Sequence, residues 1–523
     1  MGTAISNIDL TVIAIYFIVV LLIGLVVARS TKTSEDLFLG GRTFGWGLIG
    51  LSLFASNIST STIIGLSGAA YSTGIVQSVY EWMTGIPLII AALIFIPLYL
   101  KSRITTIPEF LELRFDRRSR KFFSVVTIFT SIVVDTAGGL YAGAIVLKAF
   151  FPDLVIWQTT LVLALIAGIY TAFGGLKAVV YTDAIQAIIL ILGCSVLAYM
   201  MFEKLDFSWQ NIVANAPEGH LSIIRPIDDE SLPWPGLICA VPILGFWYWT
   251  TNQYIVQRVL GAKDVNNARW GVILASFLKI IPLFIMVIPG TMAIGLFPGL
   301  ENADQVFPTA VMNILPIGLV GLVLAGLISA IMSSVDSTLN SASTLFVVDF
   351  VKTKNLNISE KLTVKYGRIT TLVLMAVAAL WAPMIANFGG IWVYLQQMFS
   401  IIVPPIAVLF LVGVFYKRGN GEGAYFTLIW GTLLGVLLFI LGQLGYWPLH
   451  YTYNVGLMVL VSAIIFVVRS RMTAPPEMEK ISNYTYNKGL INEGIQEHSW
   501  YKDYRYQIVL LLILIGVLVN VFW

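Results

Sequence analysis

The stretch LSLFASNISTSTIIGLSG, Leu51–Gly68, decides how the rest of the chain is interpreted. It lies within an apolar segment, yet six of the eight residues from Ala55 to Thr62 have side chains that can hydrogen-bond. Hydrocarbon offers such groups no partners, so a lipid-facing helix gains nothing from them. Either the helix is interrupted here and its freed carbonyls bind a cation or a polar solute, or small side chains let two helices pack closely. Both interpretations stay open from this stretch alone.

Composition indicates a membrane protein. The 523 residues are 58% hydrophobic and only 11% charged, which is typical of a polytopic helical membrane protein and not of a soluble one. The two cysteines lie in apolar segments, so no disulfide framework is expected. The three histidines lie in predicted loops, and the sequence shows no metal cluster and no nucleophile–base pair. We therefore do not expect an enzyme.

Apolar segments of spanning length predict an all-α integral membrane protein with about fourteen transmembrane helices. With the N-terminus outside, all but four of the 31 Lys and Arg residues fall on the inner side, as the positive-inside rule requires. Both termini are then expected outside a plasma (inner) membrane. The segment 308–347 is too long for one crossing, so its C-terminal part should project into the cytoplasm. The segments are 9–28, 43–69, 77–100, 122–147, 157–175, 178–201, 235–255, 270–296, 308–347, 367–388, 391–415, 424–444, 451–468 and 507–523.

A second polar interruption matches the first. The segment FWYWTTNQYIVQR, Phe246–Arg258, follows a proline-rich entry and begins a five-span block, 235–415, just as the opening stretch begins the block 43–201. Corresponding breaks in two halves of a membrane protein indicate a transporter binding site. No soluble domain is appended. The polar inner loop 469–506 is expected to be cytoplasmic and partly disordered.

Ionisable residues inside spans are rare and indicate function by default. Glu81 and Asp183 also fit as interfacial charges, whereas Asp135 lies deep in its segment. Lys279 lies near mid-membrane, and with Glu81 it predicts a polar cavity that can hydrogen-bond hydroxyl groups. Asp336 belongs to the serine-rich segment LISAIMSSVDSTLNSAS.

That serine-rich segment has a specific geometry. Residues three and four apart share a helix face, so Ala330, Ser333 and Ser334 line one side. Facing the freed carbonyls of Ala55 and Ile58, they would form a five-oxygen cage that suits a hard monovalent cation. Close packing of small residues is the alternative.

Amides and aromatic rings extend the predicted cavity. Asn57 and Gln396 offer amides, and Tyr80, Tyr248 and Trp392 offer rings that can stack on the apolar face of a pyranose. Together with the charges, this is the usual composition of a sugar site, although aromatic residues are also common in membrane spans.

The chain resembles the sodium/solute symporter family, within it the sodium/glucose cotransporter branch, over nearly its whole length. The resemblance implies a LeuT-type fold with two inverted five-helix repeats, 43–201 and 235–415. The extra N-terminal helix is 9–28, and three helices follow within 424–523, all in a single transmembrane domain, 1–523. The motifs that carry the resemblance are LFASNIS at 53–59, YTDAIQ at 181–186, LPWPG at 232–236, WYW with NQYIVQR at 247–258, and SSVDSTLNSAS at 333–343.

Position by position, the resemblance implies functional residues. The coupling ion would be Na⁺, held by carbonyls of Ala55, Ile58 and Ala330 and hydroxyls of Ser333 and Ser334. The residues implied to contact the solute or close the site around it are Asn57, Glu81, Lys279, Gln396, the inner Tyr248, and the outer gate Leu66, Tyr80 and Trp392.

The sequence departs from sugar-binding relatives around the solute. Thr62 stands where they carry Gln or His, Gly245 where one bacterial relative has Asn, and Asp135 where relatives have Asn or Lys. We expect a sodium-coupled symporter that imports a hexose-like sugar by alternating access. A sodium symporter for myo-inositol, sialic acid or a carboxylate is the alternative, and a sugar-gated sensor is less favoured. The expected partners are a small solute, sodium and the lipid bilayer, with no nucleic acid.

One hypothesis concerns a second cation. Asp336 stands where relatives usually have a hydroxyl, next to a position that binds a second sodium ion in some of them. Asp183, Ser333, Asp336 and Ser337 are therefore predicted to form a second cation site.

Overall fold

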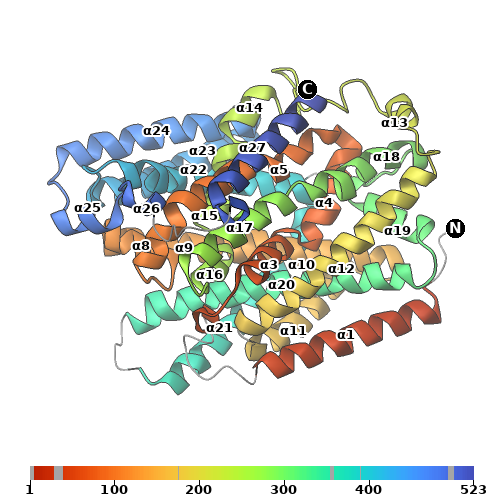
Figure 1. Ribbon diagram of the computed structural model, residues 1–523, viewed down its shortest axis with the longest axis horizontal. Helices are drawn as coiled ribbons and strands as arrows, with labels where there is room; N and C mark the ends of the chain where they lie inside the picture. The colour runs from red at the N-terminus through yellow and green to blue at the C-terminus, as the bar shows by residue number, and fades with distance from the viewer. Residues whose placement is uncertain (1–4, 29–38, 175, 354–357, 389, 493–499) are drawn as a thin grey trace.

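A computed structural model describes residues 5–28, 39–174, 176–353, 358–388, 390–492 and 500–523. These residues form helices and no named strand, with one isolated parallel bridge between Phe44 and Ala262. In Figure 1 the long helices run side by side, with the N-terminus and α13 at one end of the molecule and α25 at the other.

The N-terminal part of the chain, up to residue 203, is built from helices that include two π-helical turns, η3 and η4. They are α1 (Asn7–Ala28), η1 (Gly40–Arg42), α3 (Trp46–Asn57), α4 (Thr60–Thr73), η2 (Ile75–Ser78), α5 (Val79–Trp82), α6 (Gly85–Ile90), η3 (Ala91–Phe95), α7 (Ile96–Lys101), α8 (Ile107–Arg114), α9 (Arg117–Phe129), η4 (Thr130–Thr136), α10 (Ala137–Phe150), α11 (Ile156–Gly174) and α12 (Leu176–Glu203).

The described residues after 203 are also helical and include two further π-helical turns, η5 and η7. Its helices are α13 (Trp209–Asn215), α14 (Trp234–Cys239), α15 (Val241–Thr250), α16 (Gln253–Leu260), α17 (Val265–Leu278), η5 (Leu283–Val287), α18 (Ile288–Leu296), η6 (Ala303–Gln305), α19 (Val306–Ile314), α20 (Leu319–Phe346), η7 (Val347–Lys352), α21 (Glu360–Trp381), η8 (Ala382–Phe388), α22 (Ile391–Phe415), α23 (Gly421–Gln443), α24 (Tyr451–Met472), α25 (Met478–Tyr484), α26 (Gly489–Asn492), η9 (Trp500–Lys502) and α27 (Tyr504–Val521).

The number of spans is lower than predicted when judged by length and apolarity. Among the described residues, 10 helices are long and apolar enough to cross a membrane, or up to 11 if the bent pair α3 and α4 counts as one span. The prediction of fourteen is therefore not confirmed. The predicted segment 235–255 forms the short helices α14 and α15 and the start of α16, and α1 and α11 contribute only the shorter apolar stretches Asn7–Val20 and Ile156–Leu165.

Two predicted segments contain more structure than the sequence indicated. The segment 308–347 is divided, because Pro316 and the positive φ of +91° at Gly318 separate α19 from α20. The loop 469–506, predicted to be partly disordered, contains α25 and α26, and Arg269 donates to the Leu490 carbonyl at 2.7 Å. Residues 493–499 lie outside the described part.

The predicted helix interruption is confirmed. Helix α3 ends at Asn57, α4 begins at Thr60, and the two axes differ by 58°. The Ser59 hydroxyl caps α4 by accepting the Thr62 N–H at 3.3 Å. The polar run therefore supplies the cap that lets the chain restart as a helix inside the protein.

Candidate functional site

The break between α3 and α4 lies against the serine-rich helix α20. The Thr60 hydroxyl donates to the Leu327 carbonyl of α20 at 2.7 Å, which fixes the start of α4. Since α3 ends at Asn57, its last carbonyls, Ala55 among them, have no following helical turn to satisfy them. Ile58, in the link, has non-helical dihedral angles of φ −82° and ψ 66°. The break therefore lies against α20, the helix that carries Ala330, Ser333 and Ser334, and the sodium cage itself stays a prediction.

A buried carboxylate joins this break to α20 and α12. Asp183 accepts hydrogen bonds from Ser52 at 2.9 Å and from Ser56 at 3.2 Å, both on α3. It also accepts from Ser333 on α20. Because the Ser333 hydroxyl donates its hydrogen to Asp183, the lone pairs of its oxygen remain available to a cation.

Arg258 is a site residue that the sequence analysis missed. It was counted among the inner-loop cations, yet it is 1% exposed and forms an ion pair with Asp183 at 3.0 Å. It also donates to the hydroxyls of Ser52 and Ser337, each at 2.9 Å. Its position at the end of the polar run NQYIVQR was the available signal.

This arrangement bears on the second cation hypothesis, which stays a prediction. Arg258 already engages Asp183 and Ser337, so a cation held by both would require the guanidinium to withdraw. Asp336 lines a separate cavity of about 20 Å³ together with Ser333 and Gln186.

A central cavity of about 90 Å³ lies beside the helix break. Its walls include four predicted solute residues, Asn57, Glu81, Tyr248 and Gln396, and the predicted sodium residue Ser334. The fifth, Lys279, is 1% exposed and donates to both Glu81 and Asn57. The two opposite charges that predicted a polar cavity therefore form a buried ion pair, and Glu81 belongs to the cavity wall.

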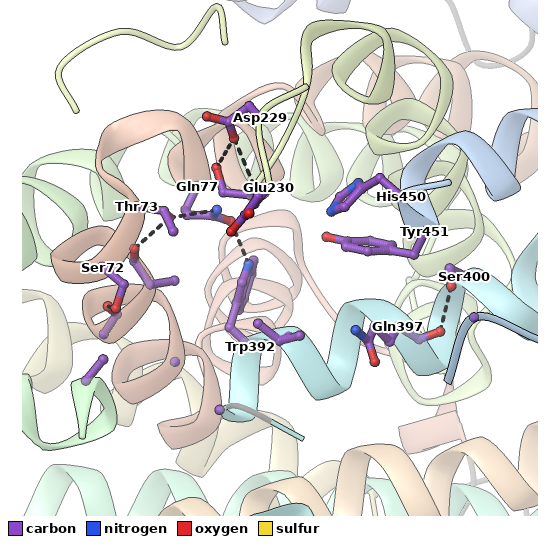
Figure 2. A pocket seen from close by; sticks show the side chains of 18 of the residues that line it. Ser72, Thr73, Gln77, Asp229, Glu230, Trp392, Gln397, Ser400, His450 and Tyr451 are labelled. Carbon is purple, nitrogen blue, oxygen red and sulfur yellow. Dashed lines mark hydrogen bonds between the residues drawn. The ribbon is translucent and has the colours of Figure 1, made fainter. Parts of the chain in front are cut away.

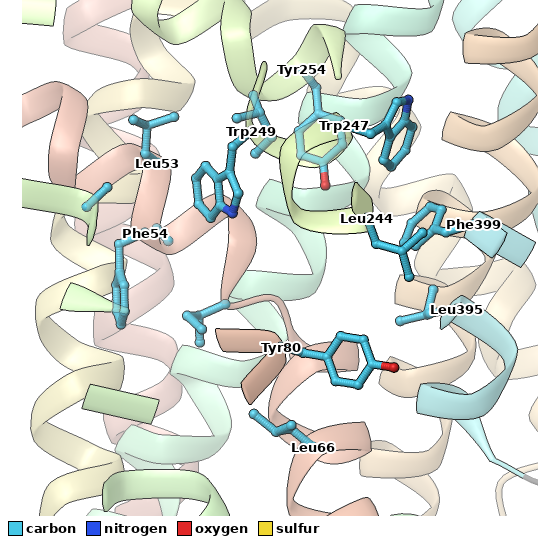
Figure 3. Close-up of a cluster of buried hydrophobic side chains, with 14 of the residues drawn as sticks. Leu53, Phe54, Leu66, Tyr80, Leu244, Trp247, Trp249, Tyr254, Leu395 and Phe399 are labelled. Atoms are coloured by element: carbon cyan, nitrogen blue, oxygen red, sulfur yellow. The ribbon is translucent and has the colours of Figure 1, made fainter. Parts of the chain in front are cut away.

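The predicted outer gate lies between this cavity and a larger vestibule of about 1040 Å³, and Trp392 borders both. Tyr80 and Trp392 meet edge to face with ring centroids 5.6 Å apart. Figure 2 shows the Trp392 indole donating to Gln77, at 3.0 Å. The Tyr80 hydroxyl bonds to that of Tyr451 at 3.1 Å, and Leu66 lies close to Tyr80 in Figure 3. These contacts join Tyr80 and Trp392 to each other and to neighbouring helices, and their role as a gate stays a prediction.

The other end of the cavity is covered by aromatic side chains. The hydroxyls of Tyr248 and Tyr254 are 2.6 Å apart, and the ring of Tyr248 packs edge to face against Trp249 at 5.2 Å. In Figure 3 Trp249 and Tyr254 lie on the opposite side of the hydrophobic cluster from Tyr80. Tyr248 therefore lies among the aromatic residues at this end of the cavity, and its role in closing the inner side stays a prediction.

The vestibule is acidic. Its lining includes Glu218, Asp229, Glu230, Glu301 and Asp304. Burial raises the pKa of Asp304 to about 6, although the Ile391 backbone N–H that it accepts opposes the shift. Burial also lowers the pKa of His450 to about 4. These residues come from loops that the charge pattern placed outside.

With this geometry established, comparison with known proteins identifies the family. The family model of the sodium:solute symporter family matches residues 37–431. The chain belongs to this family. A rabbit (Oryctolagus cuniculus) sodium/myo-inositol cotransporter 2 is 34% identical over 530 residues, covering 91% of this chain and 78% of that protein. A mouse (Mus musculus) sodium/glucose cotransporter 4 is 32% identical over 531 residues, covering 91% and 77%.

Solved structures share the fold of this symporter. A Na⁺-coupled sialic acid symporter in a substrate-bound, outward-open state has a TM-score of 0.75 at 23% identity, covering 90% of this chain and 99% of that one. Mhp1, a nucleobase-cation-symport-1 family transporter in a closed conformation, has a TM-score of 0.55 at 14% identity, covering 87% and 99%. This symporter is therefore a sodium-coupled, multi-pass membrane protein with a LeuT-like fold, and its relatives are transporters, not enzymes.

Proposed function

We propose that this symporter imports a hexose-like sugar or a polyol together with sodium by alternating access. The observation that carries the proposal is the central cavity, where hydroxyl, amide and carboxylate groups lie beside aromatic rings and directly next to the helix break. The glucose and myo-inositol cotransporters among the relatives support this class of solute. Because sodium/myo-inositol cotransporters are among the similar relatives, myo-inositol is the second candidate.

Sodium would bind where α3 breaks against α20. The carbonyls of Ala55, Ile58 and Ala330 and the hydroxyls of Ser333 and Ser334 would supply five neutral oxygens. Two sets of hydrogen bonds support this position. Thr60 at the start of α4 donates to α20, and Asp183 accepts from both α3 and α20. A cation in this position would tighten the same contact between α3 and α20.

The solute would bind to Asn57, Glu81, Lys279 and Gln396. The cavity of about 90 Å³ is smaller than the roughly 300 Å³ at which ligand sites begin, so it must expand to admit a sugar. Parting of Tyr80 and Trp392 towards the vestibule would provide that space, with Leu66 as the third gate residue. Movement of Tyr248 would open the inner path.

The repeats 43–201 and 235–415 would rock against each other around this site, as inverted repeats do in secondary transporters. The helix 9–28 and the three helices within 424–523 would lie outside this core, in a plasma (inner) membrane with both termini outside. Moving one charge through 100 mV releases about 2.3 kcal/mol, and a tenfold sodium gradient adds about 1.4 kcal/mol. One ion per cycle could therefore sustain roughly 500-fold accumulation.

Sodium-driven uptake into proteoliposomes tests the proposal, with D-glucose and myo-inositol as labelled probes. The double substitution Ser333→Ala with Ser334→Ala is expected to reduce uptake at least about tenfold at low sodium, because it removes two of five ligands. The matched control is Ser341→Ala, which lies on the same helix and removes a buried hydroxyl without a hydrogen-bond partner among the described residues.

Unchanged uptake by the double variant would show that the sodium cage lies elsewhere. Sodium current without accumulation of either probe would instead indicate a sugar-gated sensor or channel, and would contradict symport.

A further inference from the structure

Asp135 is a half-buried acid that the proposed mechanism does not use. It lies on the π-helical turn η4, in the middle of the helical run Arg117–Phe150. Such turns insert an extra residue into a helix and occur frequently at functional sites. The Thr136 hydroxyl holds this one in place, because it donates to the Ser131 carbonyl at 2.6 Å and lies 2.7 Å from the Thr338 hydroxyl of α20.

The side chain of Asp135 borders the central cavity. It shares that wall with Ser334, Tyr248 and Tyr254. Its Oδ2 atom is buried and has no hydrogen-bond partner among the described residues. A buried acceptor without a donor is costly and calls for an explanation. A donor that arrives with the solute would provide one.

The charges of the cavity wall do not balance. Glu81 and Asp135 are the charged side chains of the lining, which contains no Lys, Arg or His in the described part of the chain. Lys279 neutralises Glu81, and Arg258 is engaged by Asp183. The wall therefore holds one acidic side chain, that of Asp135, which no basic side chain of the described residues neutralises.

We propose that Asp135 sets the charge selectivity of this symporter. Its carboxylate accepts hydrogen bonds from hydroxyl or ammonium groups of the solute and repels solutes that carry a carboxylate. The substrate class is then neutral and amino-bearing sugars or polyols, and acidic sugars are excluded. The inference rests on the proposed function, since it concerns the solute that shares this cavity with sodium.

The wild-type protein provides the first test. Sodium-driven uptake into proteoliposomes is measured at pH 7.5 for D-glucose, myo-inositol, D-glucosamine, D-glucuronate and N-acetylneuraminate. Uptake of one or more of the first three is expected to exceed that of both acids by about 100-fold or more, because placing like charges together costs several kcal/mol.

Substitution of Asp135 tests whether this residue causes the charge selectivity. Asp135→Asn keeps the shape and removes the charge, so the preference for neutral over acidic probes is expected to fall at least about tenfold. The matched control, Asp153→Asn, removes an exposed acid just beyond α10 and should leave the preference unchanged. A ratio of two uptakes is insensitive to the amount of folded protein, so a purely structural role of Asp135 would not move it.

Three outcomes would overturn the inference. Wild-type uptake of D-glucuronate or N-acetylneuraminate comparable with that of the neutral probes would do so, while sodium symport itself would stand. An unchanged preference in Asp135→Asn would assign the selectivity to another group. A change in the charge moved per solute without a change in preference would make Asp135 a cation ligand instead. If no probe accumulates in the wild type, the proposed function fails first and the inference fails with it.

Discussion

Asp183 and Asp135 both lie within the membrane-spanning region, yet their surroundings are opposite. Asp183 is contacted by three hydroxyls and one guanidinium, which come from α3, α20 and α16. Asp135 has an oxygen with no partner among the described residues and borders the cavity. An acidic side chain inside a transporter can therefore either join helices or remain available to a ligand. The residues around it distinguish these two roles.

The largest expected effect lies on the Asp183 side. Arg258→Ala leaves a carboxylate buried without its cation, and removing one partner of a buried pair costs about 3–5 kcal/mol. We expect a large loss of thermal stability in detergent and loss of sodium-driven uptake. The double variant Asp183→Asn with Arg258→Gln removes both charges and should recover much of the stability. If Arg258→Ala alone is as stable as the wild type, Asp183 does not depend on its ion pair.

A third acid, Asp304, sharpens the comparison, because the partner it has in the structure is the Ile391 backbone N–H at 3.3 Å. Its pKa is raised from 3.8 to about 6 in the folded protein, so ionisation is harder in the folded state than in the unfolded one. The contribution of this group to stability is therefore largest below about pH 4 and is lost as the pH rises from there through 6, by about 3 kcal/mol.

Thermal unfolding at pH 5 and pH 7.5 checks this prediction. Asp304→Asn keeps an acceptor for Ile391 but cannot ionise, so it should lose that part of the pH dependence and be more stable than the wild type at pH 7.5. An identical pH dependence in both proteins would contradict the raised pKa.

The smallest effect on stability is expected for Asp135→Asn. No hydrogen bond or ion pair to a described residue is lost, so the unfolding free energy should change by less than about 1 kcal/mol. The same isosteric change at Asp183 should cost several times more, because it leaves Arg258 without a counter-charge. Equal losses at the two positions, measured by thermal unfolding in the same detergent, would remove the contrast between them.

Much of the site was predictable from residue type and spacing. Polar residues in an apolar run predicted the break at Ile58, and helical spacing predicted the shared face of Ser333 and Ser334. The opposite charges of Glu81 and Lys279 were correctly expected near one another. Their roles in binding sodium and solute stay predictions that the transport experiments decide.

Other features depend on contacts that the chain order does not reveal. Arg258 was assigned to an inner loop because a cation at the end of a segment usually faces water. In the structure it is buried and paired with Asp183, which lies 75 positions away in the sequence. The predicted number of spans is not confirmed by the length and apolarity of the described helices, because broken segments such as α14–α16 form short helices. The structure of 478–492 was missed because its order comes from docking on other helices, as in the bond from Arg269 to Leu490.

The sequence by itself determined the family, the helical membrane architecture and the polar interruption, because each of these depends on local composition and short motifs. The tertiary structure alone decided which buried charges are paired. An ion pair depends on distances between residues from different helices, and those distances exist only after the helices pack. The contrast between a neutralised Asp183 and an available Asp135 is therefore a property of the fold and not of either residue.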